Sequence, residues 1–72
     1  ATPLDDGLRQ AMDLQRMGRV DDADRIVRGL LAAAPDCVPA LQLLGVLDAQ
    51  RGRLATAHAL LSRAVALDPA SA

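Results

Sequence analysis

Few side chains in this sequence are of the types that carry catalysis or hold a metal ion. Histidine and cysteine occur once each, as His58 and Cys37. The residues three and four positions from His58 are Leu, Ala or Ser, so no Cys, Asp or Glu shares its side of a helix. A nucleophilic Cys37 would need a nearby base or cation to lower its pKa, and only Asp36 stands beside it. We therefore interpret His58 as a surface histidine and Cys37 as a loop thiol.

The charged residues are all Asp or Arg. The neighbouring acids Asp5-Asp6 and Asp21-Asp22 have the type needed for acid–base catalysis, but each pair falls in the expected first turn of a helix, where the helix dipole favours carboxylates. The arginines are interleaved with aspartates, and no aromatic residue is present to stack on bases, so nucleic-acid binding is not expected. The sequence predicts a protein that is not an enzyme, with no catalytic residue, cofactor or metal. The arginines considered for a basic, nucleic-acid-binding stripe are Arg16, Arg19, Arg25, Arg28, Arg51, Arg53 and Arg63.

The composition predicts one small helical domain. The chain has 72 residues, 51% of them apolar, and no Phe, Tyr or Trp, so its core must consist of Leu, Val, Ile, Met and Ala. Ala and Leu dominate this mixture and favour helix over strand. A single cysteine forms no internal disulfide, and a chain this short is marginally stable, so we expect self-association or attachment to more protein.

The chain carries no membrane or targeting signal that we recognise. Its longest apolar run, Leu30–Ala34, is far shorter than the roughly 20 residues that cross a bilayer. No basic segment followed by an apolar one opens the sequence, so we expect a cytoplasmic protein without membrane partners. The exclusive use of Arg and Asp for charge is typical of a GC-rich bacterial genome.

Apolar residues at helical spacing, with Gly and Pro between them, predict four helices. The first has Thr2 as its N-cap and Pro3 at its first position, and it ends at Gly18. The second covers Val20–Ala34 and stops at Pro35.

The third helix has Asp36 available as its cap and Pro39 just inside, and it ends at Gly52. The fourth covers Leu54–Leu67 and stops before Pro69. The connections are two to four residues long, so consecutive helices are expected to pack antiparallel.

The second half of the sequence repeats the first after 34 residues. This shift superposes Gly18 on Gly52 and Pro35 on Pro69. A fixed period of this length is the signature of stacked helix–turn–helix units. Other superposed pairs are Arg19 and Arg53, Ala23 and Ala57, Leu4 and Val38, Met12 and Val46, Val20 and Leu54, Ile26 and Leu60, Val27 and Leu61, and Leu31 and Val65.

This pattern resembles the tetratricopeptide repeat. The first unit departs from the family pattern at Gly7, Gln10 and Leu30, and Asp48 stands where the family usually has Tyr. The second unit supplies the family's landmarks at Leu41, Leu44-Gly45, Ala57, Leu61, Ala64 and Pro69. The first unit keeps Ala11, Leu14, Ala23, Val27 and Pro35.

The resemblance implies an all-α fold of two tandem helix–turn–helix repeats, residues 4–37 and 38–71 of a single domain covering 1–72. The four antiparallel helices would be a fragment of an α–α superhelix. A closed four-helix bundle is the structural alternative, but a bundle has no need for a repeated Gly, Ala and Pro framework.

In stacked repeats of this family the first helix of each pair lines a concave face. By resemblance, that face would bind an amphipathic helix or an extended peptide, or would associate with a second copy; alternatively, its apolar residues are simply core. The Lys and Asn residues with which chaperone-binding members hold a terminal carboxylate are absent. The predicted surface consists of Leu8, Arg9, Met12, Gln15, Arg16, Gln42, Leu43, Val46 and Gln50.

The resulting hypothesis is a protein–protein interaction module or scaffold. Two repeats leave the end of the second one uncovered, and that end is expected to be apolar, so we expect a homodimer. The dimer would be either symmetric or domain-swapped with a hinge at Gly18 or Pro35. Alternatively, the run Pro39–Leu47 followed by Gln50–Arg53 resembles repeats that precede catalytic domains in some bacterial glycosyltransferases and sulfotransferases, where the module would recruit substrate or mediate assembly.

Overall fold

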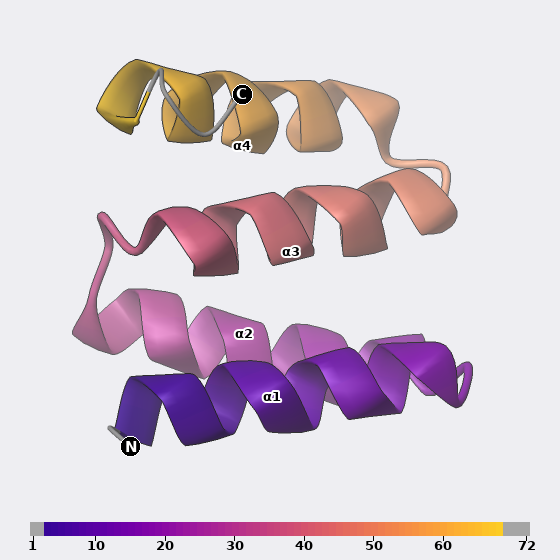
Figure 1. The fold of residues 1–72 in the computed structure, drawn as a ribbon. Helices are drawn as coiled ribbons and strands as arrows, with labels where there is room; N and C mark the ends of the chain where they lie inside the picture. Colours follow the sequence, from indigo (N-terminus) through magenta and orange to yellow (C-terminus); the bar gives the residue numbers. More distant parts are fainter. Residues whose placement is uncertain (1–2, 69–72) are drawn as a thin grey trace.

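The computed structural model describes residues 3–68, with side chains from residue 5 onward. Four helices account for most of this range, and no strand occurs within it. Successive helices run antiparallel (Figure 1), which confirms the predicted all-α arrangement of two helix–turn–helix pairs. The expected cap Thr2 and the expected stop Pro69 lie outside the described residues. The helices are α1 (Pro3–Arg16), α2 (Val20–Ala33), α3 (Val38–Gln50) and α4 (Leu54–Leu67).

The turns inside the two pairs have the same backbone geometry. Gly18 and Gly52 adopt φ angles of +81° and +79°, which residues with a Cβ atom rarely adopt. In each turn the amide of the following residue, Arg19 or Arg53, donates a hydrogen bond of 2.8 Å to the carbonyl five residues earlier. This is the glycine C-cap that closes a helix and redirects the chain. The geometry of the turn therefore recurs after 34 residues.

Helix α3 does not begin with the expected side-chain cap. Cys37 is its N-cap residue, and no side chain caps the helix. The Asp36 carboxylate instead accepts a hydrogen bond of 3.3 Å from Arg63 on α4. Pro39 also lacks an amide hydrogen at the position where a capping side chain would find one of its donors. The prediction that Asp36 caps this helix is therefore wrong.

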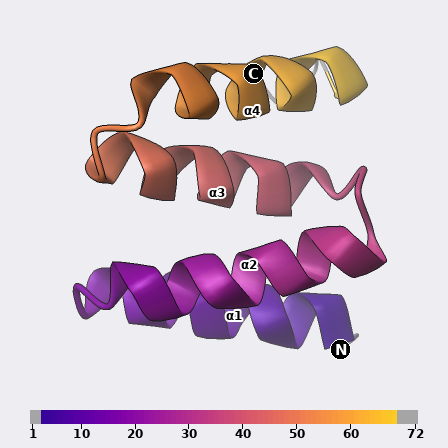
Figure 2. The same ribbon diagram turned by 180° about the vertical axis from the view of Figure 1, so that it is seen from behind.

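The helices form an open stack. The pair α1 and α2 packs together, α3 lies against α2 and touches α1, and α4 lies against α3 (Figures 1 and 2). Among the described helices, α4 contacts α3 and no other helix. A closed four-helix bundle is thereby excluded, because its first and last helices would share the core.

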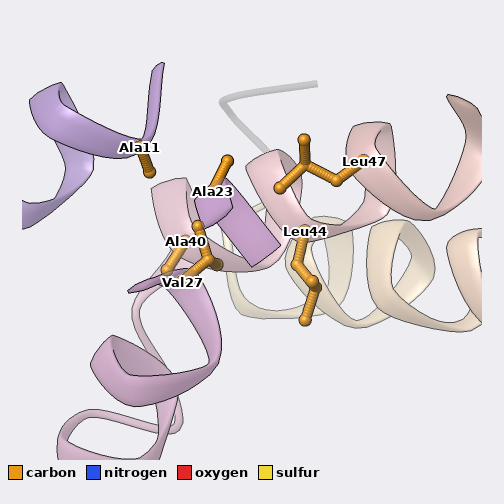
Figure 3. Packing of buried hydrophobic residues seen from close by; sticks show 6 residues of the cluster. All are labelled: Ala11, Ala23, Val27, Ala40, Leu44 and Leu47. Carbon is orange, nitrogen blue, oxygen red and sulfur yellow. The ribbon is translucent and has the colours of Figure 1, made fainter. Parts of the chain in front are cut away.

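The core lies where α1, α2 and α3 meet, and half of its buried side chains are alanines. Ala side chains let helix axes approach closely, which offsets the absence of aromatic side chains to fill a wider space. Figure 3 draws the six buried side chains of this core cluster, which are Ala11, Ala23, Val27, Ala40, Leu44 and Leu47.

Residues that differ in size between equivalent positions of the two pairs have a packing explanation. A Cβ atom placed on Gly7 would lie 2.8 Å from Leu30 Cδ2, so Leu30 of α2 fills the space that a side chain on α1 would take. At the equivalent positions of the second pair, the large residue is Leu41 on α3 and the small one is Ala64 on α4, and both are buried. Large and small residues have exchanged helices, so the two pairs keep a similar volume with different residues.

No helix among the described residues has the length and apolarity needed to cross a membrane.

Candidate functional site

An apolar groove runs between the first helices of the two pairs. Its volume is about 310 Å³. The helical spacing of 3.6 residues per turn places positions 8, 12 and 15 on one side of α1, and positions 39, 42, 43 and 46 on one side of α3. Six of the nine residues of the predicted surface line it, and Pro39 is an addition. The lining consists of Leu8, Met12, Gln15, Pro39, Gln42, Leu43 and Val46.

The groove has an inner and an outer set of apolar side chains. Leu8 and Leu43 are half-buried and pack against the core cluster, as the interpretation of these residues as core expected. Met12 and Val46 are 52% and 41% exposed. The inner pair therefore supports the fold, and the outer pair presents apolar surface.

The remaining residues of the predicted surface lie outside this groove. Arg9 and Arg16 line a second hollow of about 390 Å³, which is formed by α1 alone. Its other lining residues are Asp5, Leu8, Met12 and Asp13. Arg16 forms an exposed ion pair with Asp13. Gln50 lines neither hollow. The second hollow is larger and shares Leu8 and Met12 with the groove, but it belongs to one helix and its other lining residues are charged.

The single histidine and cysteine are not part of either hollow. The structure exposes His58 on α4 and leaves Cys37 half-buried as a free thiol. Within residues 3–68 there is no group of three or more His, Cys, Asp and Glu side chains arranged to hold a metal ion.

Sequence reasoning missed a buried charged cluster between α2 and α3. The Asp48 side chain is fully buried, and Asp24 on α2 is 9% exposed. Arg28 donates a hydrogen bond of 2.9 Å to Asp24, and its guanidinium lies 3.9 Å from the Asp48 carboxylate. Arg51, just after α3, pairs with Asp24 at 3.5 Å and also with Asp21. This arginine–aspartate cluster joins the end of α3 to the beginning of α2.

The electrostatics of the cluster follow from its geometry. The hydrogen bond to Asp24 raises the pKa of Arg28 above its ordinary value, partial burial opposes this, and attraction to Asp24 and Asp48 adds to it. Neither Asp48 carboxylate oxygen accepts a hydrogen bond from the described residues. Its charge is balanced through space by Arg28 and by Arg53, whose guanidinium is 4.0 Å away. Burial of a carboxylate is tolerated only with such partners.

One local signal could have indicated the cluster. Asp24 and Arg28 are four residues apart, a spacing that pairs charges on one side of a helix. The burial of Asp48 has no local signal, because its partners come from another helix and from the following turn. The 34-residue shift even pairs Asp48 with the apolar Leu14.

Comparison of the chain with protein-family models, with curated proteins and with solved structures found no significant match.

Proposed function

We propose that this chain is a non-catalytic protein-binding module of the tetratricopeptide type. The observation that carries the proposal is the groove between α1 and α3, to which both helix pairs contribute apolar side chains. The 34-residue period and the recurrence of the same glycine turn support the relation to this repeat class. In such an arrangement, the second helix of each pair supports the first, and the first helices form the binding face.

The chemistry of the groove selects a class of partner. Apolar side chains form most of its lining, and Gln15 and Gln42 supply amide groups that can both donate and accept hydrogen bonds. The groove itself contains no charged residue. The partner that fits is a short peptide segment with apolar side chains one helical turn apart, rather than a terminal carboxylate or a phosphorylated motif.

The test is a selection of peptides from a random display library on the purified chain. Binding of the selected peptides is then measured on Val46→Asp, which places a charge in the groove at a side chain already 41% exposed. Affinity is expected to fall about tenfold or more, which corresponds to about 1.4 kcal/mol. The matched control is Ala32→Asp on α2, an exposed position outside the groove, which is expected to leave affinity unchanged.

Two results would count against the proposal. One is a selection that yields no peptide above background. The other is a set of peptides that bind Val46→Asp and the unchanged protein equally well, because their site would then lie elsewhere.

A further inference from the structure

The outer side of α4 is apolar, and no other helix of the described residues packs against it. Leu54, His58, Leu61 and Val65 follow each other at spacings of four, three and four residues, so they form one stripe along the helix. Leu54, Leu61 and Val65 are 68%, 38% and 46% exposed. Because α4 contacts only α3 among the described helices, none of those helices covers this stripe, which we call the α4 stripe.

The chain itself shows how a face in this position is normally covered. The 34-residue shift places the α4 stripe on Val20, Asp24, Val27 and Leu31 of α2. Val27 is fully buried, and Val20 and Leu31 are half-buried against the core cluster beneath α3. Leu61 packs against Gly45 of α3 on one side. Its equivalent in the first pair, Val27, is fully buried in the core cluster, whereas Leu61 keeps 38% of its surface exposed. The α4 stripe therefore has the composition of a face that is covered by a further helix.

The other end of the stack cannot cover the α4 stripe of a neighbouring molecule. The α3 residues of the core cluster are Ala40, Leu44 and Leu47. Their equivalents on α1 are Asp6, Gln10 and Asp13, which are all exposed. Stacking α1 of one copy on α4 of another would bury these two carboxylates, together with the Arg16 partner of Asp13, against leucine and valine, and removing charged groups from water at such a surface is costly.

The face that matches the α4 stripe is the α4 stripe of a second copy. Arg63 is the one Arg of α4, and it pairs with Asp36 at 3.3 Å. His58 stands where α2 has the Asp24 carboxylate, so the stripe carries no acid. We propose that two copies of this chain associate α4 to α4 across a two-fold axis, with Leu54, Leu61 and Val65 in the interface. Such a contact is closed, because each copy uses the same patch.

The proposal is independent of peptide binding, since the groove is lined by α1 and α3 and not by α4. Light scattering over a concentration series measures the mass in solution. Protein concentration is followed by refractive index, because the chain has no Trp or Tyr to absorb at about 280 nm. The unchanged protein is expected to have twice the 7.5 kDa mass of one chain. Val65→Asp is expected to return the mass to that of a monomer, since the variant would bury a carboxylate at the two-fold contact.

The matched control for Val65→Asp is Ala66→Asp. It adds the same charge to the same last turn of α4, at an exposed position about 100° further round the helix, and is expected to remain a dimer. Leu54→Asp is the second variant. An acid in the first turn is favoured by the helix dipole, so this variant keeps α4 folded while charging the other end of the stripe, and it too is expected to be monomeric. Far-UV circular dichroism verifies the helix content of all three.

A mass of 7.5 kDa for the unchanged protein at every concentration would overturn the proposal, since the stripe would then be left open or take a different partner. A dimer that survives both Val65→Asp and Leu54→Asp would also overturn it. That result would locate the contact in the groove or in an exchange of helices about the Gly18 or Pro35 turn.

Discussion

Gly45 and Gly29 both lie inside helices, but a methyl group added at each would meet opposite surroundings. At Gly45 the new Cβ atom would lie 2.8 Å from Leu61 Cγ and 2.9 Å from Leu61 Cδ2, whereas at Gly29 no atom lies within 4 Å. Gly45→Ala is expected to lower the free energy of unfolding by about 1–3 kcal/mol through overpacking of α3 against α4. Gly29→Ala is expected to raise it by about 0.5–1 kcal/mol, because alanine restricts the unfolded backbone.

Urea denaturation followed by far-UV circular dichroism measures both changes. Equal stabilisation by the two substitutions would contradict this description of the α3–α4 contact, because it would mean that Leu61 moves aside without cost. The comparison is sharp because the chemical change and the helical setting are the same at both positions.

Arg51 and Arg16 form ion pairs in very different settings. The side chains of Arg51 and Asp24 are 22% and 13% exposed, whereas those of Arg16 and Asp13 are 78% and 52% exposed. Arg51→Met keeps much of the side-chain volume but removes one of the two cations beside Asp24, so we expect a loss of about 1–3 kcal/mol in unfolding free energy. Arg16→Met is expected to change it by less than about 0.5 kcal/mol.

Thermal or urea unfolding of the two variants, compared at the same protein concentration, tests this difference. If Arg51→Met were as mild as Arg16→Met, the arginine–aspartate cluster would contribute little to holding α3 on α2. The apolar contacts of the core cluster would then account for that junction alone.

At the scale of the helix, features that depend on nearby residues were predicted from the sequence, whereas features that depend on a partner from another helix were not. Gly18 and Gly52 end their helices as expected, because a positive φ angle depends on the residue itself. The cap of α3 was predicted wrongly, because Asp36 finds Arg63 on a distant helix. A side chain with two possible partners is assigned correctly only when both are known.

Which residues line the groove could also be predicted from local sequence. The spacing of residues along α1 and α3 determines which side chains share a side, so Leu8, Met12 and Val46 could be assigned to one face. Arg9 and Arg16 were assigned to the same face. Each follows a groove-lining residue by one position, which turns it about 100° around the helix, and both line the hollow of α1. The burial of Asp48 could not be predicted from helical periodicity, because it depends on the guanidinium groups of Arg28 on α2 and Arg53 in the following turn.

For the whole molecule, the open stack predicts a gradient of local stability. Helix α3 has neighbours on both sides, α1 contacts both α2 and α3, and α4 has α3 alone. In the Val65→Asp variant, the amide hydrogens of α4 are therefore expected to exchange with solvent faster than those of α1, α2 and α3. The proposed α4-to-α4 association predicts that, in the unchanged protein at high concentration, protection of α4 rises towards that of α3.

Hydrogen exchange followed by NMR or mass spectrometry measures this gradient. Uniform protection of the four helices in the variant would contradict it, since the chain would then open as one cooperative unit. The position of α1 provides the internal reference, because α1 is also terminal but has two helical neighbours.

The exchange of large and small residues between the two pairs also affects how the chain avoids misfolding. Tandem repeats risk joining the wrong halves, because their helices resemble one another. A hairpin of α1 with α4 would set Gly7 against Ala64 and leave a void, and Ala11 would carry the methyl group that Leu61 has no room for at Gly45. A hairpin of α3 with α2 would set Leu41 against Leu30 and overpack. Gly7 and Leu30 in the first pair, and Leu41 and Ala64 in the second, thus favour packing of each helix against its own partner in the hairpin.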